Sequence, residues 1–146
     1  MPQDGAKEAL VRGLNEDLAH EYQAIVSYLL YSRLANGPHR PELAEFFEGE
    51  IEDELGHAKL LAHKIVALGG TPTTRPAEVR LSVDNREMLE LALEAEKETI
   101  GRYTRRLEEA ESAGEVGLRV DLENIVAEET KHKEDLERIL FRWQEL

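Results

Sequence analysis

A Glu-x-x-His motif occurs twice in this sequence, once as Glu54-x-x-His57 and once as Glu129-x-x-His132. Residues three apart lie on the same face of an α-helix, so each motif directs one carboxylate and one imidazole the same way. Carboxylates and imidazoles are both ligands for transition-metal ions. The repetition therefore predicts two similar metal-binding faces on two separate helices.

A single glutamate precedes each motif at a similar distance. Glu21 lies 33 residues before Glu54, and Glu94 lies 35 residues before Glu129. Both lone glutamates fall on the apolar stripe of a predicted helix, where an unpaired carboxylate is unfavourable. Four-helix bundles hold two metal ions in their core with this combination of groups. The predicted ligands, which we also expect to carry the chemistry, are Glu21, Glu54, His57, Glu94, Glu129 and His132.

Any one of these acids, taken alone, fits a residue at a helix edge or half of a buried ion pair equally well. All six together favour metal binding, because no Lys or Arg lies near them on the same helical lines. Two divalent cations would balance the charge of four carboxylates. Oxygen-rich ligands with two nitrogens and no sulfur favour iron, with manganese as the alternative, over zinc.

Several neighbouring residues are candidates for supporting roles. Asp53 and Glu128 each come directly before a motif glutamate, and we expect them to accept the imidazole N–H groups unless they are ordinary surface acids. Tyr28 is expected beside the site, as a hydrogen-bond donor, a redox-active neighbour or a core residue. Glu98 is expected either near the site or paired with Arg102.

Gly and Pro residues divide the chain into four segments whose apolar residues repeat at helical spacing. We expect helices over about residues 4–35, 41–68 and 84–112, and a fourth through residue 143. The connection TPTTRPAEVRLSV, between the second and third, contains two prolines and no periodic pattern. A link of this length can span the height of a bundle, so it predicts that the second and third helices are parallel.

Composition narrows the class of protein further. The chain has 146 residues, a net charge of −13 and no cysteine. We expect a single domain over residues 1–146, no binding to nucleic acid, and no disulfide, iron–sulfur or thiolate chemistry. Neither a membrane-length apolar run nor a signal peptide is evident, and a cytoplasmic location is expected.

The chain resembles the ferritin-like diiron superfamily, and bacterioferritin most closely, along nearly its whole length. The stretches LNEDLAHEYQAIVSYLLYSR, EGEIEDELGHAKLL, LELALEAEK and IVAEETKHKEDLE resemble the four bacterioferritin helices in order. The resemblance implies an all-α ferritin-like four-helix bundle with one long crossover between helices two and three. It also implies a dinuclear iron centre that Glu54 and Glu129 bridge, with Glu21 and His57 on one ion and Glu94 and His132 on the other.

The sequence departs from these relatives in three ways. Leu55 stands where bacterioferritin has its haem-ligating methionine, so no haem is expected. The sequence ends at Leu146 without the short fifth helix of storage cages, so we expect a homodimer rather than a closed cage. Lys97 occupies the position of the extra rubrerythrin glutamate, and the four-cysteine rubredoxin domain of rubrerythrins has no counterpart here.

Three functions fit this set of residues. The first is a ferroxidase that oxidises Fe(II) with O2 or peroxide in iron handling or storage. The second is a rubrerythrin-like peroxide reductase or manganese catalase-like enzyme, which keeps a stable dimetal cofactor and would use a separate electron donor. The third is a non-catalytic iron carrier. Ligands and fold are common to all three, so iron turnover must distinguish them.

Overall fold

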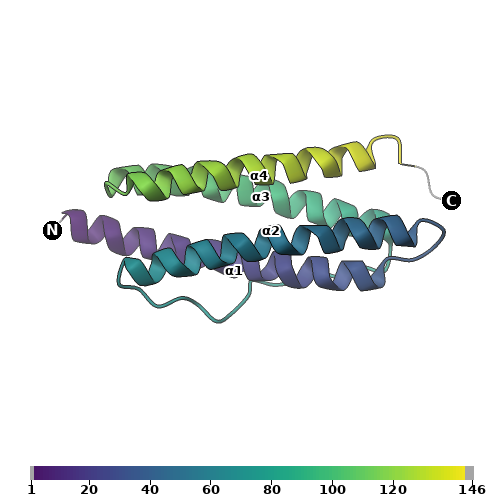
Figure 1. Ribbon diagram of the computed structural model, residues 1–146, viewed down its shortest axis with the longest axis horizontal. Coiled ribbons are helices and arrows are strands. Elements are labelled where there is room, and N and C mark those ends of the chain that lie inside the picture. The colour runs from purple at the N-terminus through teal and green to yellow at the C-terminus, as the bar shows by residue number, and fades with distance from the viewer. Residues whose placement is uncertain (1, 144–146) are drawn as a thin grey trace.

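Four long helices make up most of residues 2–143, the part of the chain that the computed structural model describes. They are α1 (Pro2–Leu34), α2 (Arg40–Ala67), α3 (Asn85–Ser112) and α4 (Val116–Leu140). The described residues contain no β-strand, and the predicted all-α four-helix bundle is confirmed (Figure 1). None of the described helices is both long and apolar enough to cross a membrane.

Local signals account for where the helices begin and end. Asp84 caps α3, because its carboxylate accepts a hydrogen bond from the Glu87 backbone N–H at 3.0 Å. Gly69 follows α2 with a φ of +88°, and Gly114 follows α3 with a φ of +74°. Residues with a side chain rarely adopt this left-handed conformation, so glycine is the favoured stop after a helix.

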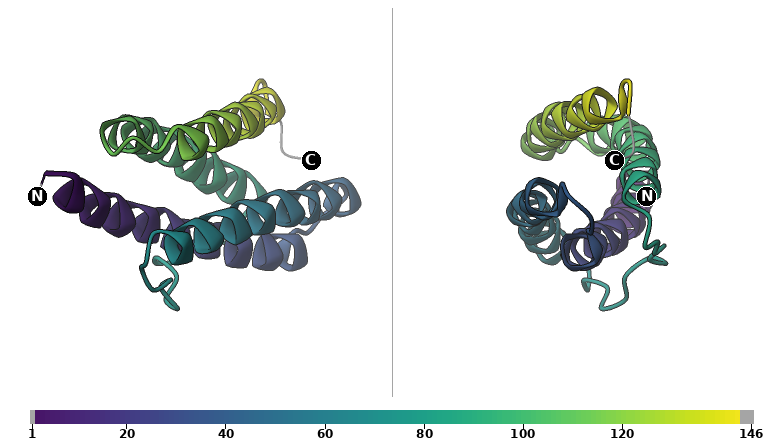
Figure 2. Two further views of the ribbon diagram at one scale, coloured as in Figure 1. Left: turned by 60° about the vertical axis from the view of Figure 1, so that its left-hand side comes forward. Right: turned by 90° about the vertical axis from the view of Figure 1, so that its right-hand side faces the viewer.

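The long connection between α2 and α3 runs along α1 from Asn15 to the C-terminal end of the helix. Tyr22 of α1 donates a hydrogen bond to the Thr73 carbonyl at 2.9 Å, and Tyr31 donates to the Arg80 carbonyl at 2.6 Å. Because the connection follows α1 in the same direction, it returns the chain to the end at which α2 began. Helices α2 and α3 are therefore parallel, as predicted (Figures 1 and 2).

The core consists of two apolar clusters. One lies around Leu14, Leu61 and Leu118, and the other lies around Phe47, Leu89 and Leu136. Apart from Asp17, the buried acidic and histidine side chains come from the middle of the helices, at sequence positions between those of the two clusters. The bundle therefore places a polar layer at mid-height, between two apolar layers that hold the helices together.

Candidate metal centre

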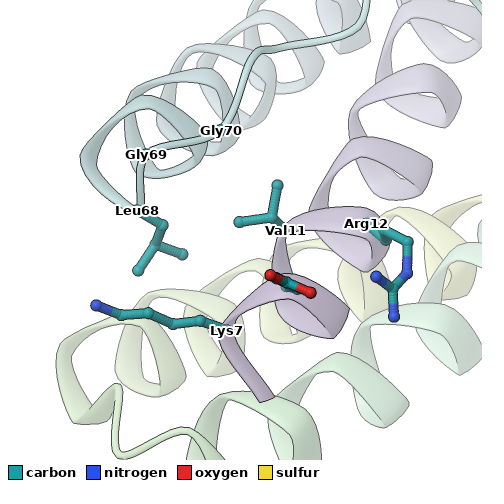
Figure 3. Close-up of a pocket in the computed structure, with 7 residues that line it drawn as sticks. Lys7, Val11, Arg12, Leu68, Gly69 and Gly70 are labelled. Atoms are coloured by element: carbon teal, nitrogen blue, oxygen red, sulfur yellow. The ribbon is translucent and has the colours of Figure 1, made fainter. Parts of the chain in front are cut away.

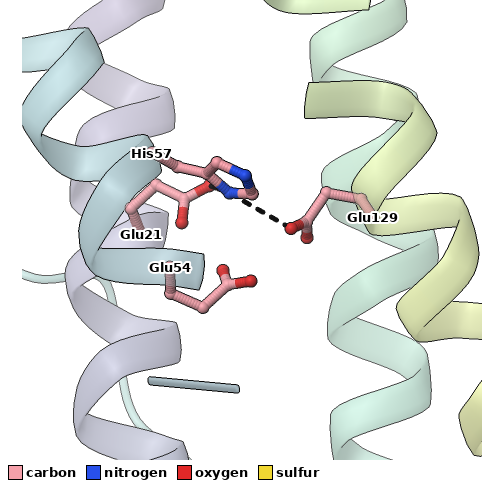
Figure 4. Close-up of side chains that lie close together, drawn as sticks. All are labelled: Glu21, Glu54, His57 and Glu129. Atoms are coloured by element: carbon pink, nitrogen blue, oxygen red, sulfur yellow. Dashed lines mark ion pairs between the residues drawn. The ribbon is translucent and has the colours of Figure 1, made fainter. Parts of the chain in front are cut away.

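Every helix contributes to the polar layer at the middle of the bundle. Its six central residues are each at most 5% exposed, although all are acids or histidines. Figure 4 shows four of them, with Glu21 from α1, Glu54 and His57 from α2, and Glu129 from α4, directed toward a common space. The full set is Glu21, Glu54, His57, Glu96, Glu129 and His132.

These six residues form two overlapping groups, each compact enough to hold one metal ion. Ligand atoms of Glu21, Glu54, His57 and Glu129 all lie within 4.8 Å of one another. The same limit holds for the second group, which is Glu54, Glu96, Glu129 and His132. The two motif glutamates, Glu54 and Glu129, belong to both groups. The arrangement therefore provides two adjacent positions that share two carboxylates.

The structure places Glu94, one of the six predicted ligands, outside this layer. Its side chain is 56% exposed and forms an ion pair with Arg80 at 3.4 Å. Glu96, which is 3% exposed, occupies the expected place instead. Two residues along an α-helix rotate the side-chain direction by roughly 200°, so only one of the two glutamates can face the core.

Glu94 was predicted instead of Glu96 because apolar residues repeat at helical spacing along two different lines of α3. The prediction followed the line through Leu91, whereas the buried line runs through Leu89, Ala92, Tyr103 and Ala110. Two signals in the sequence identify the buried glutamate. Glu96 lies on this second line at three- and four-residue spacing, and it precedes Glu129 by 33 residues, the same distance that separates Glu21 from Glu54.

The six side chains leave unpaired atoms that face one another. Within residues 2–143, each of the six has one buried oxygen or nitrogen without a hydrogen-bond partner. A buried polar atom without a partner is unfavourable by roughly 1–3 kcal/mol, so six at one place require a common explanation. Two metal ions would satisfy all six. The unpaired atoms are Glu21 Oε2, Glu54 Oε1, His57 Nδ1, Glu96 Oε2, Glu129 Oε1 and His132 Nδ1.

Each motif histidine contacts a carboxylate on the helix that carries the other motif, through the ring nitrogen Nε2. Nε2 of His57 on α2 lies 2.6 Å from Oε2 of Glu128 on α4. Nε2 of His132 on α4 lies 2.9 Å from Oδ2 of Asp53 on α2. The predicted contacts of Asp53 and Glu128 are thus present, in a crossed arrangement. Each contact favours a proton on Nε2, which leaves Nδ1 to face the site as a ligand atom.

A second crossed pair of contacts involves tyrosines. Tyr28 of α1 donates a hydrogen bond to Oε1 of Glu96 at 2.8 Å, which confirms the donor role predicted for it. Tyr103 of α3 donates to Oε1 of Glu21 at 2.5 Å. No site role was predicted for Tyr103. The spacing in the sequence could have identified this role, because Tyr103 follows Glu96 by seven residues, as Tyr28 follows Glu21.

The buried carboxyl groups of Glu54, Glu96 and Glu129 have pKa values that are shifted in different directions in the metal-free protein. Burial, together with the negative charges of Glu21 and Glu129, raises the pKa of Glu54 well above its usual value. Burial and the nearby carboxylate of Glu129 do the same for the pKa of Glu96. Burial opposes ionisation of Glu129 as well, but the neighbouring carboxyl group of Glu96 and the motif histidines hold its pKa well below the usual value. Burial thus shifts Glu54 and Glu96 toward their neutral, protonated forms.

Both motif histidines have raised pKa values. Burial disfavours the imidazolium of His57, but the Glu129 and Glu21 carboxylates, 3.2 Å and 3.7 Å from its Nδ1, outweigh this effect and raise its pKa to about 11. Burial also disfavours the imidazolium of His132, yet the nearby carboxylates of Glu129 and Glu50, 3.5 Å and 3.0 Å from its ring nitrogens, raise its pKa strongly. Metal binding must displace these protons, so it is linked to pH.

A small cavity of about 30 Å³ lies between α1 and α3 and reaches three of the central carboxylates, Glu54, Glu96 and Glu129. Ser27 and Ala92 are among the small side chains that leave this space open. A much larger surface pocket, of about 560 Å³, lies at the N-terminal part of α1 and the end of α2, away from the carboxylates (Figure 3). That pocket is lined by Lys7, Glu8, Val11, Arg12, Leu68, Gly69 and Gly70.

A four-helix bundle with two overlapping Glu and His groups at mid-height defines a recognised class of protein. The chain belongs to the ferritin-like family, whose ferritin-like domain matches residues 11–146. It is similar to the bacterioferritin of Streptomyces coelicolor, with 32% identity over 129 residues that cover 88% of this chain and 77% of the relative.

Solved structures show the same relationship. A ferritin-like diiron-carboxylate protein from Bacillus anthracis is 50% identical, with a TM-score of 0.91 over 92% of this chain and 97% of the other. The bacterioferritin of Desulfovibrio desulfuricans, solved with its diiron site in different catalytic states, is 27% identical. Its TM-score is 0.89 over 96% of this chain and 82% of the other. The chain is therefore a ferritin-like protein related to bacterioferritins.

Proposed function

We propose that this protein binds two iron ions in the polar layer and acts as a ferroxidase, oxidising Fe(II) with O2 or H2O2. The observation that carries the proposal is the set of six buried, unpaired ligand atoms from Glu and His residues. Further support comes from the diiron sites of its structural relatives. Manganese is the alternative metal, and the absence of haem stays a prediction.

The residues divide into two terminal pairs and one shared pair. Glu21 and His57 would hold one ion, and Glu96 and His132 would hold the other. Glu54 and Glu129 belong to both groups. Each bound Fe(II) supplies one electron, so two ions together provide the two electrons that reduce O2 to H2O2, or H2O2 to water.

The protein contributes positioning and exclusion of water. Tyr28 and Tyr103 each donate to a terminal glutamate, and Asp53 and Glu128 orient the two imidazoles. These contacts hold the ligands in place while iron changes charge. The cavity between α1 and α3 has room for only one or two water-sized molecules, which suits a small oxidant such as O2 or H2O2.

The test is aerobic oxidation of Fe(II), followed by stopped-flow absorbance with wild type and two matched variants. Glu96→Ala should reduce the oxidation rate to the buffer background, because one terminal ligand of the pair is lost. Glu94→Ala removes the same charge from the same helix and should retain the full rate. Equal activity in the two variants would refute the assignment of Glu96.

Stopped-flow absorbance also distinguishes the three candidate functions when the reactions of the Fe(II)-loaded protein with O2 and with H2O2 are compared. A ferroxidase consumes many equivalents of Fe(II) per chain. A peroxide reductase would react slowly with O2 and rapidly with H2O2, while its iron stays bound through repeated cycles. A carrier would bind Fe(II) without accelerating its oxidation. The second or third result would overturn the proposed ferroxidase activity.

A further inference from the structure

The two halves of the chain are related by a constant offset of 75 residues, and this relation makes their differences informative. All the paired residues of the centre follow this offset. A centre with two identical ends would give both metal positions the same affinity. Any charged residue near the centre that breaks the offset makes the two positions different. The pairs that obey it are Glu21 and Glu96, Tyr28 and Tyr103, Asp53 and Glu128, Glu54 and Glu129, and His57 and His132.

The first break in the symmetry is a buried carboxylate at one end only. Glu50 is 9% exposed, and its Oε2 lies 3.0 Å from Nε2 of His132. Asp53 Oδ2 lies 2.9 Å from the same nitrogen, which carries at most one proton and cannot fully satisfy both acids. Oε2 of Glu50 has no hydrogen-bond partner of its own. The residue 75 positions later is Ile125, which is 3% exposed and uncharged.

The second break is a group of buried cations at the other end. Arg102 and Arg106 are buried, and Arg106 Nε lies 2.8 Å from Oδ2 of Asp17, one helical turn before Glu21. The other acids near Arg106, Glu16 and Glu109, are 55% and 40% exposed, so solvent screens them. Buried charge at this end therefore sums to about one positive unit. The residues 75 positions from Arg102, Arg106 and Asp17 are Ser27, Tyr31 and Ala92, all uncharged.

Building on the proposed function, we propose that the two metal positions differ in affinity, that the Glu96–His132 position binds the first divalent cation, and that Glu50 determines this preference. A buried negative charge beside His132 attracts a cation, and buried positive charge near Glu21 opposes one. A divalent ion that displaces one proton on binding still adds one net positive charge to its position. The difference in electrostatic attraction between the two positions therefore remains.

The test is an anaerobic titration of the metal-free protein with Co(II), read by visible absorbance and by calorimetry. Wild type should bind two ions in two steps, the first tighter than the second. Glu50→Gln should weaken the first step by about 10- to 100-fold, the range typical for groups that support a metal-ligating histidine. Glu52→Gln removes the same charge from an exposed position of α2 and should change neither step.

Two further variants assign the steps to positions. His132→Ala should abolish the tight step, whereas His57→Ala should keep it. Ile125→Glu, which places an acid at the matching position, should bring the two affinities closer together. Circular dichroism verifies that each variant is folded, and Ile125→Glu tests the idea independently if Glu50→Gln fails to fold.

Several results would overturn the inference. Equal affinities in wild type would do so while leaving the proposed dimetal centre intact. A tight step that survives His132→Ala would assign the preference to the wrong end. A third bound ion that disappears in Glu50→Gln would make Glu50 a ligand itself. If no Co(II) binds at all, the inference and the proposed function fail together.

Discussion

The burial of Glu54 and Glu96 makes the stability of the metal-free protein depend on pH. Their pKa values are raised in the folded state, so between the unfolded value of about 4.3 and the folded value the native protein binds more protons. Stability therefore falls as pH rises through this window. The raised pKa of His57, about 11, acts in the same direction above its unfolded value of about 6.5.

We predict that the melting temperature of the metal-free protein falls steadily between about pH 5 and pH 8.5. Glu129, whose pKa is lowered, affects stability only below about pH 4.5 and does not reverse this trend. The measurement is thermal unfolding by circular dichroism in the presence of a chelator. A melting temperature that rises with pH over this range would contradict the description of the buried carboxylates.

A substitution at one ligand should stabilise the metal-free protein while destroying the metal site. Glu54→Gln removes one of the mutually repelling acids, so the metal-free form should melt higher than wild type. Wild type should gain roughly 4 kcal/mol when free metal exceeds its Kd by a thousandfold, and the variant should gain little. Calorimetric unfolding with and without Mn(II) measures both effects.

Glu94→Gln is the matched control for this experiment, because Glu94 is exposed and lies outside the cluster. It should leave both the metal-free melting temperature and the metal-induced gain close to wild type. A Glu54→Gln protein that melts well below metal-free wild type would show that the acids do not repel one another in the folded state.

Between elements, the approach of α3 to α1 depends on a glycine. A Cβ at Gly13 would overlap the Arg106 guanidinium, which is buried and held by Asp17. Gly-to-Ala changes inside helices normally stabilise by about 0.5–1 kcal/mol. At Gly13 the sign should reverse, with a loss of about 1–3 kcal/mol, because the guanidinium has to leave its place.

Gly49 supplies the comparison on α2, since a Cβ there would meet nothing within 4 Å. Gly49→Ala should give the ordinary small stabilisation. Urea unfolding of the two variants and wild type measures both changes. A stabilising Gly13→Ala would mean that Arg106 relaxes freely and that its ion pair does not determine the spacing of α1 and α3.

For the whole molecule, we predict a homodimer in solution. Leu29 on α1 and Leu81 and Val83 in the crossover are large apolar side chains that are 45%, 55% and 75% exposed in the single chain. Their burial against a second copy would be favourable. Light scattering should give about twice the chain mass of 16.6 kDa.

Substitutions at these residues test the dimer further. Leu29→Asp combined with Leu81→Asp should shift the protein toward monomer. Val120→Asp, at an α4 residue that is 51% exposed, should leave the mass unchanged. A particle with the mass of a closed cage would overturn the predicted homodimer.

The helices and most of the site could be predicted from the sequence, because both depend on local spacing. Gly and Pro positions and the Asp84 cap decide where helices stop and start, and Glu-x-x-His places two groups on one face whatever surrounds the helix. The lone glutamate Glu21 was also predictable, since α1 has a single clear apolar line. The length of the crossover was enough to predict that α2 and α3 are parallel.

The rotation of each helix and the partners that meet across the bundle could not be predicted, because they depend on tertiary packing. Helix α3 carries two apolar lines, and its packing against α1 and α4 selects the one with Glu96 instead of Glu94. The contacts of His57 with Glu128 and of His132 with Asp53 join residues 71 and 79 positions apart. Local periodicity contains no information about such pairings, because they depend on the relative height and rotation of separate helices.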